Sequence, residues 1–392
     1  MVNTIIMLGC IAILLGIAFL ISDDKNNINK RTVFVGLGMQ LLLTIFVMKT
    51  TIGSRLLETI ALGVDKIGSF GLEGVSFVFG DLSNNMFVFA INVLALIVFT
   101  SAFIGVMNYL GVIPFFVKHV GGLLSKLLGT SKAESFVAIG NTVLGQTESP
   151  LLTKPYLKEM NDSELFATIV SGMGSASASI LIGYSMLGIP MKYLLIAIFS
   201  VPFTTLVIAK IMKPNKQVNN QEVEVVKSQA TNLFDAISRG TSDGMMIALN
   251  VGASLIAFIG LIAVLNGILG IFGTNLSGIF GVILMPLGWL FNIPASEVST
   301  FASLIGTKIS VNEFVAFTDM SAVLNTLSPR TIAILGTAMC NFGAISSIGI
   351  VLGGLTAVEP TIRERLSKLV AKGLVGAILS TLLAGAFVGL LF

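Results

Sequence analysis

Charged residues are scarce in this chain of 392 residues: Asp, Glu, Lys and Arg make up 11% of it, whereas hydrophobic residues make up 54%. A soluble globular protein carries about 25% charged residues. A soluble chain this apolar would expose hydrophobic patches large enough to cause aggregation. The mean hydropathy of +0.95 points the same way. The composition therefore excludes an ordinary soluble domain and favours a polytopic membrane protein in a lipid bilayer.

Histidine and cysteine are also scarce, which limits the possible chemistry. His119 is the single histidine and cannot build a histidine-based metal site alone. Cys10 and Cys340 lie in separate apolar runs without CxxC or CxxH spacing, so neither zinc binding nor a disulfide is expected. The chain has no Walker A and no HExxH motif, and its net charge is only +3. We therefore expect no enzyme, no organic cofactor, no ATP-driven pump and no nucleic-acid partner.

Long apolar runs dominate the chain instead. A spanning helix needs about 20 predominantly apolar residues. The first run has no basic start and no cleavage site, so it is interpreted as a span rather than a signal peptide. Eight runs are predicted to cross the membrane: 2–21, 32–47, 87–113, 165–187, 193–212, 246–269, 331–355 and 369–391.

Three further apolar stretches do not resemble clean spans. Residues 115–152 and 279–317 are interrupted by charged residues and prolines, yet each is long enough to enter the membrane and return. Turns at membrane depth are tolerated only when they are buried in protein or line a watery cavity. Both stretches are therefore predicted to be re-entrant helical hairpins. Residues 56–80 are amphipathic and predict an interfacial helix.

The distribution of basic residues orients this map. With the N-terminus and C-terminus outside, seventeen of the 23 lysines and arginines fall on the cytoplasmic side, Lys210 among them, and Lys308 falls outside. The polar linker 213–228 divides the chain into halves with the same order of elements: a hairpin, a helix rich in small polar residues, and a last span. Such inverted repeats, with a site at their interface, are typical of secondary transporters.

Each predicted hairpin carries a carboxylate motif. Residues 141–150 read NTVLGQTESP, with the consecutive polar side chains Gln146, Thr147 and Glu148. Glu313 lies in the apolar sequence VNEFVAF at 311–317. Carboxylates inside membranes are costly and usually functional, and one carboxylate accepts two hydroxyl hydrogen bonds, as a ribose diol offers. A solvated loop is the alternative for both motifs.

The helix after each hairpin carries small polar residues. Residues 171–179 read SGMGSASAS, and residues 340–349 read CNFGAISSIG. Close packing between helices explains such residues. The alternative is a broken helix whose freed carbonyls and hydroxyls bind a hard cation. Asn341 in mid-span is difficult to explain by packing alone.

At these four motifs the chain resembles the concentrative nucleoside transporter family, in its bacterial eight-span branch. GQTESP at 145–150 and NEFVAF at 312–317, each followed by a serine-rich helix, carry the resemblance, which covers almost the whole chain. It implies that Gln146, Thr147 and Glu148 hydrogen-bond the nucleobase and that Ile180 packs on it. The remaining implied contacts are Glu313 and Ser347 with the ribose, Phe342 under the nucleoside, and Asn141, Leu144, Ser175 and Ala176 with sodium.

One position departs from the family pattern. Ala344 stands where the family has a ribose-binding Asn. Asn341 lies three residues earlier, about one helical turn away, and is a candidate substitute in the substrate site. Asn141 and Ser175 favour sodium as the coupling ion, and a proton is the alternative.

The resemblance also implies an all-α homotrimer in the bacterial cytoplasmic membrane, with a scaffold and an elevator-like transport part. The expected divisions are 1–113 (scaffold spans 1–3), 114–212 (first repeat), 213–240 (cytoplasmic linker), 241–272 (span 6, scaffold) and 273–392 (second repeat). A gated channel for a small polar solute is the alternative function. The preference for purine or pyrimidine and the stoichiometry stay open.

Overall fold

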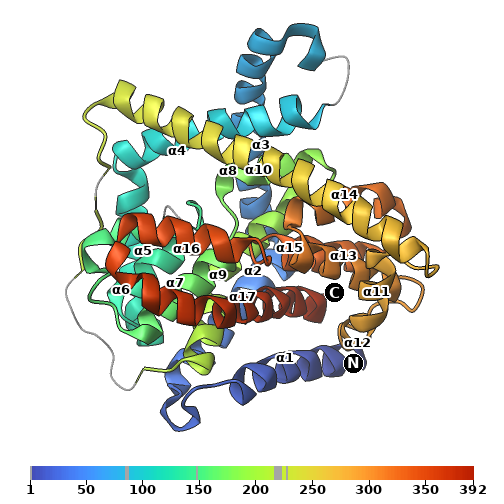
Figure 1. Cartoon of the computed structure of the whole chain (residues 1–392). Helices are drawn as coiled ribbons and strands as arrows, with labels where there is room; N and C mark the ends of the chain where they lie inside the picture. Colours follow the sequence, from blue (N-terminus) through green and yellow to red (C-terminus); the bar gives the residue numbers. More distant parts are fainter. Residues whose placement is uncertain (1, 84–87, 147–148, 216–222, 227) are drawn as a thin grey trace.

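The computed structural model describes residues 2–83, 88–146, 149–215, 223–226 and 228–392, and these form an all-α bundle (Figure 1). Within those ranges, five helical stretches are long and apolar enough to span a membrane. They are α1 (Val2–Leu20), α2 (Lys30–Lys49), Ala90–Tyr109, α9 (Met191–Met212) and Pro360–Leu391, of which α17 is Arg363–Leu391. Ala90–Tyr109 begins with a π-helical turn (Ala90–Leu94) and continues as α4 (Ala95–Tyr109).

Two of the eight predicted spans are broken in the middle. Span 165–187 consists of α7 (Asp162–Met173) and α8 (Ala178–Met186), and span 331–355 consists of α15 (Pro329–Met339) and α16 (Ser347–Val358). Each break leaves backbone groups that bond outside their own helix, such as the Ala178 N–H to the Val143 carbonyl and the Ile345 N–H to the Ile309 carbonyl. The helix break that was the alternative interpretation of 171–179 is confirmed, and cation binding there stays a prediction. Predicted span 246–269 lies inside the longer helix α10 (Leu233–Gly270).

The first hairpin is shorter than predicted. Residues 115–152 include most of α5 (Val112–Leu128), which is a separate amphipathic helix. Gly129 caps its C-terminus with a φ of 69°, in the left-handed region that favours glycine. The hairpin itself consists of α6 (Lys132–Gly140) and a 3₁₀ segment (Ser149–Tyr156).

The second hairpin is displaced in the same direction. The predicted stretch 279–317 begins inside the short helix α11 (Leu276–Ile283) and includes a second short helix, α12 (Met285–Leu290). The hairpin consists of α13 (Val298–Ser310) and α14 (Glu313–Val323), followed by a 3₁₀ turn (Leu324–Thr326). Both predicted hairpins were wrong at their N-terminal ends because apolar composition does not separate an adjoining helix from a hairpin arm.

The two halves pack around each other. In the first half, α7 contacts α9, and in the second α15 contacts α17; across the halves, α7 contacts α17 and α15 contacts α9. The chain therefore repeats one arrangement of hairpin, broken helix and long helix. Helices α1 and α2 cover this core against α17 and α9.

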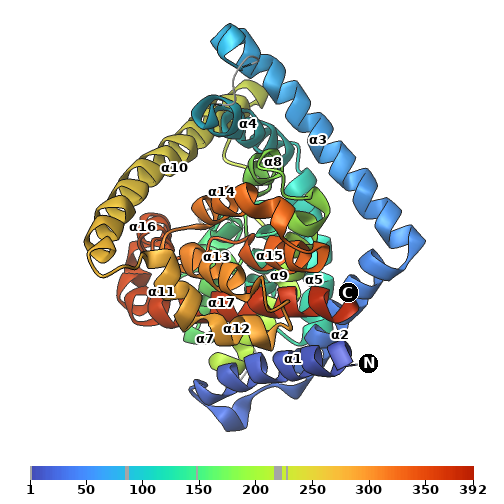
Figure 2. The ribbon, with the colours of Figure 1, turned by 90° about the vertical axis from the view of Figure 1, so that its right-hand side faces the viewer.

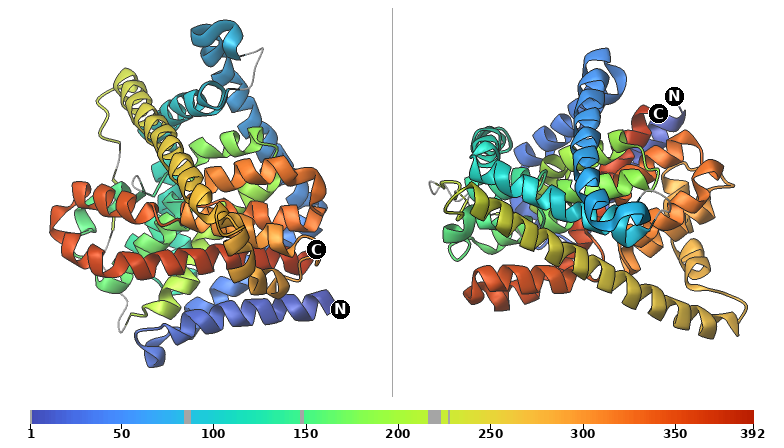
Figure 3. Two further views of the ribbon diagram at one scale, coloured as in Figure 1. Left: turned by 45° about the vertical axis from the view of Figure 1, so that its right-hand side comes forward. Right: turned by 90° about the horizontal axis from the view of Figure 1, so that it is seen from above.

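Three helices form a frame outside the core. These are α3 (Thr51–Phe79), α4 and α10, and Figures 2 and 3 show α3 and α10 running along the outside of the bundle. Helices α4 and α10 cross closely because glycines lie between them: a Cβ on Gly240 would lie 2.8 Å from the Cα of Ala102. Small residues of this kind allow close helix packing in membranes. Short 3₁₀ turns at Lys25–Asn27, Gly80–Ser83 and Pro360–Ile362 complete the described chain.

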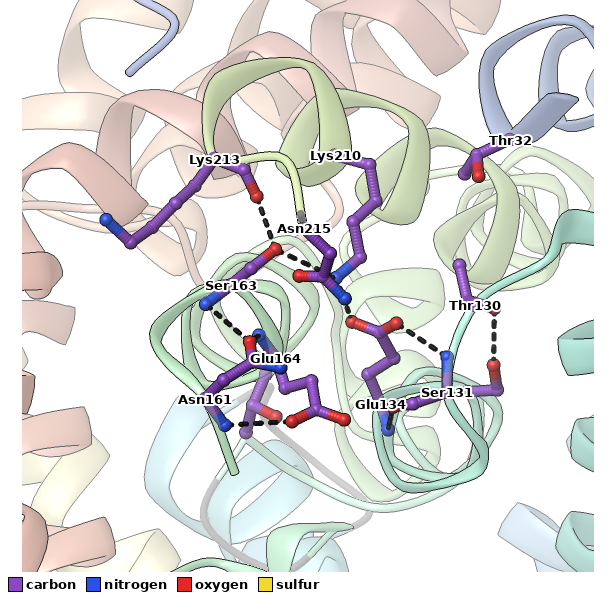
Figure 4. A network of polar contacts seen from close by, with 12 residues as sticks. Thr32, Thr130, Ser131, Glu134, Asn161, Ser163, Glu164, Lys210, Lys213 and Asn215 are labelled. Carbon is purple, nitrogen blue, oxygen red and sulfur yellow. Dashed lines mark hydrogen bonds and ion pairs between the residues drawn. The ribbon is translucent and has the colours of Figure 1, made fainter. Parts of the chain in front are cut away.

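A buried ion pair fixes the base of the first hairpin (Figure 4). Lys210, in the last turn of α9, pairs with Glu134 of α6, and both side chains are almost completely buried. Its ammonium also donates to the Ser163 hydroxyl at 3.0 Å, at the start of α7. The network therefore joins the first arm of the hairpin, α6, to helices α7 and α9. Lys210 was counted among the cytoplasmic loop residues on sequence grounds, but it is only 4% exposed.

Candidate functional site

The tip of the first hairpin lies against the break between α7 and α8. Asn141 directly follows α6, and its amide nitrogen donates to the Ser171 hydroxyl at 3.1 Å. The backbone N–H of Ala178 donates to the Val143 carbonyl at 3.1 Å, which joins the tip to the start of α8. The predicted sodium residues Asn141, Leu144, Ser175 and Ala176 are thus brought to one region by folding, and all four are buried.

The same region contains an unsatisfied oxygen. Among the described residues, the buried Oδ1 of Asn141 has no hydrogen-bond partner. Ser175 donates its hydroxyl proton to the Gly172 carbonyl at 2.8 Å, so lone pairs on its own oxygen stay available. Neutral oxygens of amides, hydroxyls and carbonyls suit a hard monovalent cation. The residue types and the orphaned oxygen therefore fit Na⁺.

The base-reading end of the predicted site is described in part. Gln146 is 6% exposed, and its buried Oε1 has no partner among the described residues. It lies against the α7 break, since a Cβ on Gly172 would lie 3.3 Å from the Cβ of Gln146. Ile180, in the first turn of α8, is buried. The predicted contacts Thr147 and Glu148 lie outside the described residues.

The second hairpin begins its second arm with Glu313, which is 5% exposed. The Tyr184 hydroxyl of α8 donates to the Glu313 carboxylate at 2.9 Å. A carboxylate from the second repeat is thereby held by a side chain from the first. The solvated-loop alternative for Glu313 is wrong in this structure, because burial removes its carboxylate from bulk water.

The break between α15 and α16 repeats the geometry of the first break. The Ile345 N–H donates to the Ile309 carbonyl of the second hairpin at 3.0 Å, the counterpart of the bond from Ala178 to Val143. The two breaks also touch each other, because the Phe342 N–H donates to the Ser175 carbonyl at 2.8 Å. Both hairpins and both broken helices therefore meet in one place.

The predicted ribose-side residues lie in this second break. Phe342 is half-buried and Ser347 is buried, with the Ser347 hydroxyl donating to the Phe342 carbonyl. Ala344 is completely buried. Asn341 is engaged by the protein: its amide oxygen accepts from Lys308 and from the Gly343 N–H, and its amide nitrogen donates to the Ala338 carbonyl at 2.7 Å.

Sequence reasoning missed two residues of this region. Lys308 was counted among the basic residues of the outer side; it lies in the last turn of α13 with 2% exposure and donates to Asn341 and, at 2.6 Å, to the Gly343 carbonyl. Tyr184 was treated as one more residue of an apolar span. The available signals were the position of Lys308 five residues before Glu313 and that of Tyr184 one helical turn after Ile180.

A cavity of about 290 Å³ leads to the first hairpin. It lies between the frame helices α4 and α10 and the hairpin residues Leu144 and Leu152. Lys154, Arg239 and Asp243 supply charged groups to its wall. The cavity reaches Leu144 of the predicted ion site, whereas Gln146 and Glu313 do not line it.

Three family models together match almost the whole chain. The model of the N-terminus of Na⁺-dependent nucleoside transporters matches residues 9–82, and that of their C-terminus matches residues 193–389. A third model, described as nucleoside recognition, matches residues 90–190. The chain belongs to the concentrative nucleoside transporter family. It is thus a transporter and not an enzyme.

Relatives and solved structures extend this result over the full length. The nucleoside permease NupC of Helicobacter pylori is 38% identical, with 97% of this chain and 96% of NupC aligned. The putative nucleoside permease NupX of Escherichia coli is 34% identical over 96% of this chain and 97% of its own. The structure of CNTnw in an inward-facing substrate-bound state superposes with a TM-score of 0.95 at 37% identity, covering 100% of this chain and 98% of that one.

Proposed function

We propose that this chain imports nucleosides across a bacterial cytoplasmic membrane in symport with Na⁺. The observation that carries the proposal is the meeting of both hairpins with both broken helices. It brings the neutral oxygens of Asn141 and Ser175 to the region that also holds Gln146, Phe342 and Glu313. Helix breaks at the interface of two repeats are where secondary transporters bind substrate and coupling ion.

Each end of a nucleoside has a matching group in this proposal. Gln146 reads the polar edge of the base with its free amide oxygen, together with Thr147 and Glu148, and Ile180 packs on its face. Phe342 supports the nucleoside from below. Glu313 and Ser347 hydrogen-bond the ribose hydroxyls. The carboxylate accepts hydrogen bonds that these hydroxyls would otherwise donate to water. Asn341 acts at the ribose side by fixing Lys308 and the backbone at Gly343.

The coupling ion is assigned to the first hairpin. Asn141 and Ser175 contribute side-chain oxygens, and Leu144 and Ala176 contribute carbonyls. When bound, Na⁺ would neutralise the partial negative charges of these four oxygens. The residues of the hairpin tip hold these oxygens together, so binding of the ion and order of the adjoining Gln146 are linked. No organic cofactor is required.

The movement is assigned to the core. We propose a homotrimer in which α3, α4 and α10 form a stationary frame, and the two repeats at 114–212 and 273–392 slide as an elevator. Residues 213–240 form the cytoplasmic linker, and both termini lie outside. The cavity between the frame and the first hairpin supplies the cytoplasmic exit. The close α4–α10 crossing at Gly240 supports a rigid frame.

Uptake into proteoliposomes tests this function. Radiolabelled uridine and adenosine are offered with and without an inward Na⁺ gradient at fixed pH, to the wild type and to Glu313→Gln. Saturable, Na⁺-stimulated uptake that the variant loses is the expected result. Uptake that follows a proton gradient and ignores Na⁺ would assign the coupling to a carboxylate instead. Non-saturable flux without countertransport would identify a channel.

A further inference from the structure

Lys308 places a fixed positive charge at the tip of the second hairpin. It lies in the last turn of α13 and is only 2% exposed. Its ammonium donates to the Asn341 amide oxygen and, at 2.6 Å, to the Gly343 carbonyl, which both belong to the second helix break. In the part of the chain that the structure describes, the ion pairs do not include Lys308. The buried cation is therefore held by neutral oxygens.

A matching backbone bond defines which parts of the two repeats correspond. In the first repeat the Ala178 N–H, at the start of α8, donates to the Val143 carbonyl of the hairpin tip at 3.1 Å. In the second the Ile345 N–H, shortly before α16, donates to the Ile309 carbonyl at the end of α13 at 3.0 Å. Each hairpin tip is thus bonded to the C-terminal side of its own break. The tips and the breaks can be compared on this basis.

Both breaks present a side-chain oxygen that is followed closely by a backbone carbonyl. In the proposed Na⁺ site these are the Ser175 hydroxyl and the carbonyl of the next residue, Ala176. In the second break they are the Asn341 amide oxygen and the carbonyl of Gly343, two residues further on. Neutral oxygens of this kind suit a hard monovalent cation. Either break can therefore hold one positive charge.

The two hairpin tips differ in what they bring to these oxygens. The first tip brings the Asn141 amide oxygen, which is buried and has no hydrogen-bond partner among the described residues. The second tip brings the Lys308 ammonium, which is a compact charge with three N–H donors. Where the tip brings an oxygen, the positive charge has to come from solution. Where the tip brings an ammonium, the chain itself supplies that charge.

From this correspondence we infer that the Lys308 ammonium is the resident cation of the second repeat, and that the oxygens of Asn341 and Gly343 form a second Na⁺ site that this ammonium occupies. The inference rests on the proposed Na⁺ coupling and extends it to the second repeat. Lys308 is thus a positioning residue. Because its charge is attached to the chain, the second break keeps its arrangement without an ion from solution, and Na⁺ is required at the first break alone.

Equilibrium binding of radiolabelled Na⁺ to the purified transporter in detergent, at fixed pH, counts the ions per chain. At saturation the wild type should bind about one Na⁺ and Lys308→Ala about two. The alanine removes the ammonium and leaves its two acceptor oxygens, with the space of the side chain, to an ion and its water. Lys308→Met is the matched control, because a flexible apolar side chain fills that space without a charge, and it should bind about one Na⁺.

Two further measurements locate the added ion. Lys308→Ala/Asn341→Leu lacks the side-chain oxygen of the second break, so its count should return to about one Na⁺. Methylammonium has the same charged head group as lysine. It should therefore displace the added Na⁺ from Lys308→Ala, whereas Lys308→Met should show no such displacement.

Each outcome decides one question. Equal Na⁺ counts in Lys308→Ala and Lys308→Met overturn the inference, and so does an added ion that persists in Lys308→Ala/Asn341→Leu. A wild type that binds about two Na⁺ overturns it even where no variant folds, because Lys308 would then replace no ion. A wild type that binds no Na⁺ overturns the proposed coupling instead, and the difference between the alanine and methionine variants still decides the inference.

Discussion

Lys308 and Asn341, which are 33 residues apart, form a buried hydrogen bond between the tip of the second hairpin and the second helix break. The same ammonium donates to the Gly343 carbonyl at 2.6 Å. A lysine is rarely buried this deeply without partners, because its charge must be compensated. The pair therefore holds the unwound segment beside Phe342 and Ala344 in one conformation.

Asn341→Ala should lower the free energy of unfolding by about 1.5–3 kcal/mol, the usual contribution of a hydrogen bond to a charged group. The reason is that the Lys308 ammonium keeps its burial but loses one of its acceptors. Thermal unfolding of the purified transporter in detergent measures the change. The control is Asn275→Ala, which removes an exposed cap of α11 and should cost about 1 kcal/mol. Equal, small losses in both variants would contradict a buried role for Asn341.

The ion pair at the base of the first hairpin gives a second stability prediction. Lys210→Met leaves Glu134 buried without its cation, and removal of one partner of a buried pair costs about 3–5 kcal/mol. The double variant Lys210→Met/Glu134→Gln should recover part of this loss, because no uncompensated charge is left. The same thermal unfolding measures both.

The matched control for the ion pair is Lys368→Met. Lys368 pairs with Glu364 on the exposed start of α17, and exposed i,i+4 pairs contribute little. No measurable change is expected there. A Lys210 variant as stable as the wild type would mean that the network in Figure 4 contributes nothing to the fold.

The fold was predictable from the sequence wherever one physical signal dominated. Runs of about 20 apolar residues located α1, α2, α9 and α17, since the bilayer thickness fixes their length. The alternation of serine and small residues at 171–179 indicated the first helix break. Hydropathy alone missed the boundary of α5, which is marked instead by the left-handed Gly129 at its C-terminus and by the capping box of Ser131 and Glu134 that begins α6.

The site was predictable only in its local motifs. Gln146 and Glu313 were selected as candidates because polar residues at membrane depth are unusual, and both are buried. The count of basic residues on each side carried no information on burial, so it did not show that Lys308 and Lys210 are buried with partners from distant segments. The bond from Tyr184 to Glu313 joins residues 129 positions apart, and the position of Tyr184 one turn after Ile180 does not identify that partner.

Asn141→Ala and Ser175→Ala each remove one neutral oxygen from the proposed ion site. The Na⁺ concentration for half-maximal uptake should rise about tenfold in each, while the KM for uridine at saturating Na⁺ changes less. Ser125→Ala is the control, since Ser125 is a buried serine in α5 that donates to the Thr130 carbonyl at 2.7 Å. A parallel rise in both constants would place these residues in the nucleoside site instead.

The last prediction concerns which helices move with the core. Span α2 was assigned to the scaffold, yet the amide of Gln40 donates to the Ser200 hydroxyl of α9 at 2.9 Å, and both residues are completely buried. Sliding would break this bond where no water replaces it, which is costly in lipid. We propose that α2 travels with the core. In a variant without Cys10 and Cys340, a Gln40→Cys/Ser200→Cys cross-link should therefore leave uptake intact.

A cross-link between frame and core supplies the comparison. A Cβ on Gly68 of α3 would lie 2.9 Å from the Ile182 side chain of α8, so Gly68→Cys/Ile182→Cys joins two parts that must slide past each other. Oxidation should arrest uptake in that variant, and reduction should restore it. Arrest by the α2–α9 cross-link as well would return α2 to the stationary frame, because a bond within one rigid body cannot stop its movement.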